Sequence, residues 1–198
     1  MINMIVRKIK ITILSLVFSF SQWSCEKTIF DKTDGYKIYT IKKGHQYSDS
    51  GFRAFTSTEL NFVVVFDNSA IYTTTDSSNQ LAINKLFGFS DCSDLHHENS
   101  ARFGWRWYNN EIQIFAYCYK NSKRADKFIG TVNLNKEYEY KLKTEGSKYI
   151  FFLNGMTDSL DNGCSSDVDY GRYFLYPYFG GIETAPHQIT IRIKELRN

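Results

Sequence analysis

Short runs of alternating apolar and polar residues recur along most of the chain. The last run, residues 188–196 (QITIRIKEL), places its three isoleucines on one side of an extended strand and polar residues on the other. This pattern predicts a strand with one buried and one solvated face, as in an antiparallel sheet packed on one side. Similar runs predict strands at residues 36–43, 51–56, 60–67, 70–74, 101–108, 111–120, 127–134, 137–143, 148–154 and 172–179.

Turn-forming residues separate these runs. They lie at Asp67-Asn68-Ser69, Asn109-Asn110, Glu145-Gly146-Ser147, Asn162-Gly163 and Gly180-Gly181. Strands at this spacing predict an all-β sandwich or barrel. The aromatic content of 17% agrees, because large rings suit a pleated sheet surface. Only residues 79–87 (NQLAINKLF) are expected to make one or two helical turns.

Residues 101–120 predict a β-hairpin with a defined register. Asn109-Asn110 suits a two-residue turn, since Asn tolerates positive φ. Pairing Tyr108 with Glu111 then makes every pair on one face apolar, which supports the register. These pairs are Trp107–Ile112, Trp105–Ile114, Phe103–Ala116 and Ala101–Cys118. We therefore expect this face in the core, with Cys118 as a buried free thiol.

The opposite face of the hairpin carries the candidate chemistry. It presents Arg102, Arg106, Tyr108, Gln113, Phe115, Tyr117 and Tyr119, and Gly104 leaves a dent opposite Phe115. Rings can stack on the C–H faces of a sugar, while guanidinium and amide groups bind hydroxyls or carboxylates. The alternative is a solvated sheet face whose long side chains lie over one another.

A histidine pair precedes the hairpin. His96 and His97 are adjacent, so they point apart in an extended chain and do not predict a metal site. One of them at the rim of the Arg/Tyr face could serve as a ligand contact or a general base. The predicted ligand-binding residues are therefore Arg102, Arg106, Gln113, Tyr117, Tyr119 and His97.

The N-terminus has the pattern of an export signal. Three basic residues precede a short apolar stretch at 11–20, and Ser24-Cys25 resembles a bacterial lipobox of the relaxed type found in Bacteroidota. The resemblance implies cleavage after residue 24 and lipidation of Cys25, hence an outer-membrane protein facing the surface or the periplasm. An ordinary secretory signal is the alternative. We expect a signal peptide at 1–24, a lipidated tether at 25–35 and a β-sandwich domain at 36–198.

Removal of the signal leaves a chain without net charge. The signal carries three of the 24 basic residues and no acidic one, so 21 basic residues balance 21 acidic ones. Nothing here has the basic excess that nucleic-acid binding demands. With Cys25 lipidated and Cys118 buried, Cys92 and Cys164 are the remaining pair, although spacing does not decide whether they bond.

Three stretches carry a family resemblance: NKLFGFSDC (84–92), HHENSARFGWRW (96–107) and YPYFGGIETAPHQITIRI (176–193). They resemble a group of uncharacterised Bacteroidota lipoproteins. The last stretch is similar to the closing segment of secreted concanavalin A-like jelly rolls that bind or cleave polysaccharides. The resemblance implies an antiparallel two-sheet jelly-roll β-sandwich with a concave face. It transfers no catalytic residue, since the RxExR, QIH and YxKxGxYxQ motifs of alginate-lyase jelly rolls are absent.

The leading hypothesis is a lipoprotein that binds a polysaccharide or oligosaccharide without cleaving it. A polysaccharide lyase is the alternative, with Arg102 or Gln113 neutralising a uronate and Tyr117 or a histidine as base. A structural or adhesive protein with a protein partner is the third. No cofactor is expected, except that the loop at 158–171 (DSLDNGCSSDVDYG) could hold a structural calcium instead of being simply solvated.

Overall fold

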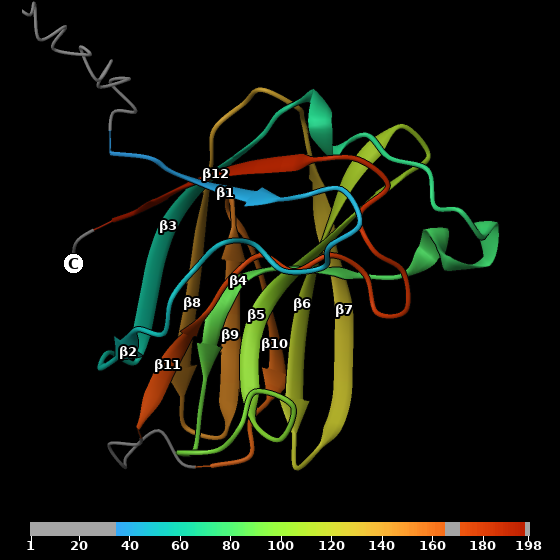
Figure 1. Cartoon of the computed structure of the whole chain (residues 1–198). Coiled ribbons are helices and arrows are strands. Elements are labelled where there is room, and N and C mark those ends of the chain that lie inside the picture. Colours follow the sequence, from blue (N-terminus) through green and yellow to red (C-terminus); the bar gives the residue numbers. More distant parts are fainter. Residues whose placement is uncertain (1–34, 165–170, 197–198) are drawn as a thin grey trace, which may run out of the picture. The chain divides into compact units, whose positions relative to one another are not determined.

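The computed structural model describes residues 35–164 and 171–196. They form two six-stranded antiparallel sheets packed face to face, which confirms the all-β two-sheet prediction (Figure 1). None of the described helices is long and apolar enough to cross a membrane. The expected signal peptide and Cys25 lie outside the described residues.

Sheet A contains both ends of the described domain. Its order is β1 (Lys37–Ile41), β12 (Ile189–Glu195), β3 (Glu59–Phe66), β8 (Tyr138–Glu145), β9 (Lys148–Leu153) and β10 (Met156–Asp161). Sheet B has the order β2 (Ala54–Phe55), β11 (Arg172–Leu175), β4 (Asn84–Ser90), β5 (Ser100–Tyr108), β6 (Glu111–Lys120) and β7 (Lys123–Val132). Two short 3-10 helices, η1 (Asn68–Ala70) and η2 (Ser77–Leu81), lie in the connection from β3 to β4.

The core between the sheets is built largely from aromatic rings. Phe103 of sheet B lies 5.8 Å from Phe62 and 5.2 Å from Phe151 of sheet A, measured between ring centroids. Trp105 is fully buried and lies 5.1 Å from Phe66. Burial of each large apolar side chain contributes about 1.5–3 kcal/mol. The apolar side chains that the alternation places on the inner face of each sheet therefore hold the two sheets together.

The β5–β6 hairpin has the predicted register at every position, from Tyr108–Glu111 to Ala101–Cys118. Asn109 and Asn110 both have positive φ, 53° and 60°, as a type I′ turn requires. Cys118 is buried and free, as expected. Cys92 and Cys164, which are 72 positions apart in the sequence, form a disulfide.

Several secondary-structure predictions need correction. Of the strands expected at 51–56 and 172–179, β2 covers only Ala54–Phe55 and β11 only Arg172–Leu175. Residues 70–74 form no strand: η1 ends at Ala70, and Tyr72 then packs on Trp105 and Phe179. Of the stretch 79–87 that was expected to be helical, residues 79–81 belong to η2, whereas residues 84–87 belong to β4, where a bulge between Lys85 and Gly88 breaks the alternation that would have indicated a strand. β10 was missed because it is a largely polar edge strand with little apolar periodicity.

Candidate functional site

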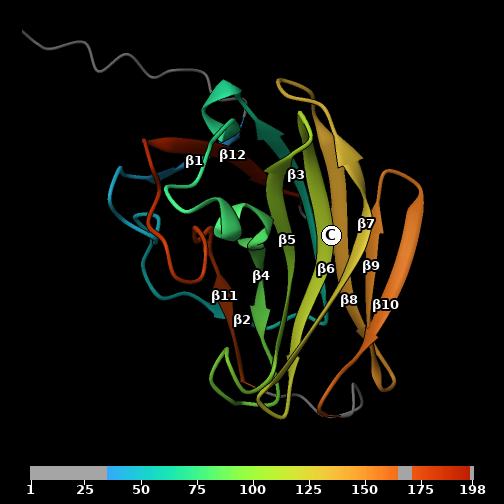
Figure 2. The ribbon, with the colours of Figure 1, turned by 90° about the vertical axis from the view of Figure 1, so that its right-hand side faces the viewer.

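Cross-strand neighbours on the outer face of sheet B form three rows, which follow from the strand registers (Figure 2). The first row is Arg124, Tyr119, Ser100 and Ser90, and beside it Tyr173 N donates to Ser90 Oγ at 3.0 Å. The second row is Asp126, Tyr117, Arg102 and Gly88. The third row is Phe128, Phe115, Gly104 and Lys85, and isolated bridges extend it from Lys85 to Tyr178 and from Tyr178 to Tyr47. These rows bring distant parts of the sequence together around Arg102. We call Lys85, Arg102, Tyr117, Tyr119, Tyr173 and Tyr178 the Arg102 site.

Arg102 is the centre of this site and is only 7% exposed. Its guanidinium lies 5.6 Å from the centroid of the Tyr117 ring, and its Nε has no hydrogen-bond partner among the described residues. No carboxylate of the described residues pairs with it. Burial lowers the pKa of Arg102, while the surrounding tyrosine hydroxyls oppose that change. The site thus contains a buried cation without a counter-charge, an arrangement that costs free energy.

Gly88 makes room for Arg102. A Cβ at this position would overlap the carbonyl oxygen of Ala101 and the backbone and Cβ of Arg102. Only glycine therefore allows β4 to approach β5 while the Arg102 side chain stands between the tyrosines.

Lys85 adds a second positive charge to the site. Its Nζ donates to the carbonyl oxygen of Gly180 at 2.6 Å and lies 5.6 Å from the Tyr117 ring centroid. Burial, followed by repulsion from Arg102 and Arg124, lowers the pKa of Lys85 to about 8. A substantial fraction of Lys85 is therefore the neutral amine in mildly alkaline solution.

The paired tyrosines of β6 are hydroxyl donors. The rings of Tyr117 and Tyr119 lie 5.9 Å apart. Burial, and then the hydrogen bond with Tyr119, raises the pKa of Tyr117, so its hydroxyl stays protonated. Tyr119 is only half-buried and presents ring surface to the solvent.

The loop between β4 and β5, residues 91–99, forms one rim of the site and is held by a disulfide. The disulfide begins at Cys92, and the neighbouring Asp91 accepts from Arg172 Nε at 2.7 Å in a fully buried ion pair. His96 N in the same loop donates to the hydroxyl of Tyr173 at 2.9 Å. These contacts hold the Tyr173 ring beside the first row.

Both rim histidines are exposed, and the charge of Arg102 acts on His96. Burial, then Arg102 and His97, lower the pKa of His96, which favours the neutral imidazole. The predicted residue, His97, is exposed and packs edge-on against His96, with ring centroids 5.5 Å apart. His97 thus borders the site through its neighbour.

Arg106 and Gln113 lie apart from the Arg102 site. Arg106 Nε donates to Gln113 Oε1 at 2.7 Å, and its Nη1 donates to the carbonyl oxygen of Leu81 at 2.9 Å. The expected dent at Gly104 is filled by Ile83, which packs with Phe115 and Tyr117. Of the predicted binding residues, Arg102, Tyr117 and Tyr119 come together, whereas Arg106 and Gln113 hold each other at the far end of the hairpin.

The alternative, a face whose long side chains lie over one another, stays a prediction beside ligand binding, because the guanidinium groups of Arg106 and Arg124 lie 4.8 and 5.9 Å from the ring centroids of Phe115 and Tyr117. Phe115 and Tyr117 are 5% and 2% exposed, although they point away from the core between the sheets. The sequence reasoning missed Lys85, Tyr173 and Tyr178. Lys85 lies next to the bulge of β4, and the two tyrosines come from a distant segment, so no local pattern marks them.

The proposed calcium ligands are engaged elsewhere where they are described. Asp158 pairs with Lys127 and Asp161 pairs with Lys148, each at 2.7 Å. The other two aspartates of that loop lie outside the described residues. In the described ranges, Asp91, Cys92 and Cys164 are the one cluster of three possible ligands, and its cysteines are bonded to each other.

No protein-family model matches this chain, and a comparison with curated protein sequences gives no match. Solved structures do match. An alginate lyase from Chlorella virus, vAL-1, superposes with a TM-score of 0.54 at 10% identity, covering 81% of this chain and 82% of that one. The alginate lyase AlyC3 gives 0.51 at 12% identity, covering 84% and 75%. A family 16 endo-glucanase from Bacteroides ovatus gives 0.51 at 11% identity, covering 81% and 80%.

These likenesses show the fold. The domain is a concanavalin A-like jelly-roll sandwich, as the resemblance in the sequence implied. At such identities they transfer no residue role, so function has to be argued from the side chains of this chain.

Proposed function

We propose that the Arg102 site binds an anionic glycan whose sugar rings carry carboxylates, as in polyuronates. The observation that carries the proposal is the buried guanidinium of Arg102, which lacks a carboxylate partner among the described residues. A ligand carboxylate would supply the missing counter-charge through charge-assisted hydrogen bonds. Lys85 adds a second cation beside it.

The surrounding rings suit the rest of such a ligand. Tyr119, Tyr173 and Tyr178 are each half-buried, so each keeps part of its ring surface at the edge of the site. The Tyr173 hydroxyl accepts from His96 N and the Tyr178 hydroxyl donates to Gln46 Oε1, so each offers a ligand its remaining hydrogen-bonding capacity. The negative face of an aromatic ring attracts the C–H groups of a sugar, and the hydroxyls can donate or accept hydrogen bonds. The fold supports the proposal, because the solved structures named above act on polysaccharides according to their names.

Cleavage by β-elimination is the second candidate, and the lowered pKa of Lys85 favours it. In this reaction Arg102 stabilises the carboxylate while the neutral amine of Lys85 removes the proton on the adjacent carbon. The electron pair then forms a C=C bond as the glycosidic C–O bond breaks. The hydroxyl of Tyr117 or Tyr119 supplies a proton to the leaving oxygen.

Calorimetry with a uronate oligosaccharide and a neutral oligosaccharide of equal length tests the binding. We expect Arg102→Met to weaken uronate binding by about tenfold or more, because a charge-assisted contact is lost. Arg106→Met is the control on the same strand and should leave affinity unchanged. Equal affinities in wild type and Arg102→Met would refute the proposal, and capture of a protein partner without any glycan signal would favour an adhesive role.

Ultraviolet absorbance of an unsaturated uronate distinguishes cleavage from binding. If the chain is a lyase, absorbance rises with polyuronate and Lys85→Met abolishes the increase. Binding without new absorbance would restrict the function to recognition.

We also propose that the protein is an outer-membrane lipoprotein anchored through Cys25. Ser24-Cys25 supports the anchor, and the disulfide between Cys92 and Cys164 supports export, since such bonds persist in oxidising compartments. Cys25→Ala should release the protein from the membrane fraction. Unchanged retention would contradict the lipid anchor.

A further inference from the structure

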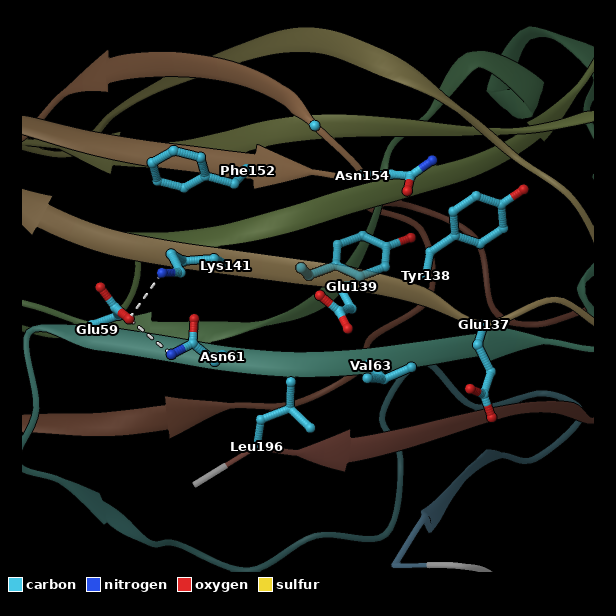
Figure 3. Close-up of a pocket in the computed structure, with 12 residues that line it drawn as sticks. Glu59, Asn61, Val63, Glu137, Tyr138, Glu139, Lys141, Phe152, Asn154 and Leu196 are labelled. Atoms are coloured by element: carbon cyan, nitrogen blue, oxygen red, sulfur yellow. Dashed lines mark hydrogen bonds and ion pairs between the residues drawn. The ribbon is translucent and has the colours of Figure 1, made fainter. Parts of the chain in front are cut away.

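A groove of about 860 Å³ crosses the outer face of sheet A, on the opposite side of the sandwich from the Arg102 site. It extends over β3, β8 and β9, and we call it the Phe152 groove. Its polar and aromatic lining includes Glu59, Asn61, Tyr138, Lys141, Phe152 and Asn154 (Figure 3).

Strand register explains how these residues meet. Asn61 of β3 is paired with Lys141 of β8, which is paired with Phe152 of β9. Figure 3 shows Phe152, Lys141 and Glu59 one after another across the three strands, with Tyr138 and Asn154 towards the other end. Neighbouring strands lie about 4.8 Å apart, so the row places a ring and its polar partners within reach of one small ligand.

The row combines a ring with a fixed polar network. Glu59 Oε1 accepts from Asn61 Nδ2 at 2.8 Å and pairs with Lys141 Nζ at 3.2 Å. The side chains of Lys141 and Glu59 remain 42% and 32% exposed, so both still reach solvent. Phe152 is half-buried between them and the next strand. A half-exposed ring beside an anchored carboxylate and ammonium offers stacking together with donor and acceptor groups for hydroxyls.

The groove carries charges of both signs. Glu59, Glu137 and Glu139 line it together with Lys141, and Lys143 lies beside the Phe152 ring. The hydrogen bond from Asn61 lowers the pKa of Glu59, which therefore stays ionised. Three carboxylates against two ammonium groups leave the groove without the cationic excess that a polyuronate needs. A cationic sugar would be repelled at the ring, because Lys141 and Lys143 lie 5.8 and 5.7 Å from the Phe152 centroid.

We propose that the Phe152 groove is a second glycan site, which takes neutral sugar rings with equatorial hydroxyls. Rings with equatorial hydroxyls present a flat C–H face to Phe152 and direct their hydroxyls sideways towards Glu59, Lys141 and Asn154. The protein would then hold a neutral chain on sheet A and an anionic chain on sheet B. This site does not depend on the function proposed for Arg102.

Calorimetry with a cello-oligosaccharide and a soluble β-glucan tests the site on the whole domain. Wild type should bind both, and Phe152→Ala should weaken binding by about tenfold or more because the stacking surface is lost. Phe152→Tyr keeps the ring and should retain affinity. Ile38→Ala, a truncation of a 47% exposed side chain on the same sheet face but outside the groove, is the control and should also retain it.

The two sites can be distinguished because each substitution should affect only one class of ligand. Arg102→Met should leave neutral-glycan binding unchanged, and Phe152→Ala should leave uronate binding unchanged. Absence of neutral-glycan binding in wild type, or equal affinity in Phe152→Ala, would overturn the proposal. So would neutral binding that is lost in Arg102→Met and kept in Phe152→Ala, because that binding would belong to sheet B.

Discussion

Replacing Arg102 with methionine should make the unliganded protein more stable. The guanidinium is 7% exposed, its Nε is unsatisfied, and no described carboxylate compensates its charge. An unsatisfied buried donor costs about 1–3 kcal/mol, and apolar replacements of buried charged groups often stabilise by a similar amount. The shorter methionine loses some packing, at about 1 kcal/mol. We therefore expect a net gain of about 1–2 kcal/mol.

Arg106→Met is the matched comparison, because this arginine lies on the same strand and face but has two hydrogen-bond acceptors, Gln113 Oε1 and Leu81 O. Losing two such bonds should cost about 1–2 kcal/mol. The two substitutions are chemically identical. Changes of opposite sign in the free energy of unfolding would therefore isolate the effect of the missing counter-charge.

Urea denaturation with and without a uronate oligosaccharide measures both parts of this prediction. Wild type should gain about 2.7 kcal/mol at a ligand concentration of one hundred times its Kd, whereas Arg102→Met, which binds tenfold more weakly or worse, should gain about 1.4 kcal/mol or less at the same concentration. A loss of more than about 1 kcal/mol in unliganded Arg102→Met would refute the reasoning, since it would mean that Arg102 already has a favourable partner.

Three further outcomes are expected. Trp105→Ala should reduce the free energy of unfolding by about 3–5 kcal/mol in urea titrations, because it empties a fully buried site, and a cost below about 1 kcal/mol would contradict that packing. Joint replacement of Cys92 and Cys164 by serine should cost about 2–5 kcal/mol and weaken uronate binding, since the bridge holds the rim loop, and unchanged stability and affinity would refute this. The pKa of Lys85 is about 8 in the folded protein and about 10.4 when unfolded, so the unfolded chain binds more protons between these values and stability should rise with pH across that window. Denaturation at pH 7, 9 and 10 should show this rise in the free energy of unfolding of wild type, and the rise should be smaller in Lys85→Met.

The β5–β6 hairpin was predictable from sequence because its determinants are local. A two-residue Asn109-Asn110 turn sets the register, and the alternation then assigns each side chain to a face. Arg102, Tyr117 and Tyr119 could be grouped for this reason.

The rest of the Arg102 site depends on contacts between distant segments. Tyr178 pairs with Lys85 through an isolated bridge across 93 positions of sequence. Tyr173 contacts β4 through a hydrogen bond to Ser90, which lies 83 positions earlier in the sequence. The bulge before Gly88 also puts Lys85 outside any simple period. The choice between His96 and His97 depended on a loop whose course is set by a disulfide and a buried ion pair, which no local pattern encodes.

The position of Cys118 between the two half-cystines imposes an order on maturation. Along the chain, Cys118 follows Cys92 by 26 residues, whereas Cys164 follows it by 72. A chain that emerges from its N-terminus therefore exposes a competing thiol before the correct partner arrives. The β5–β6 hairpin alone does not bury Cys118, because its side chain faces sheet A and its Sγ donates to the carbonyl oxygen of Asp161 in β10. Asp161 lies three residues before Cys164, so the packing that buries Cys118 is completed by the segment that also carries the correct partner. Correct pairing therefore requires the two sheets to pack before Cys92 is oxidised.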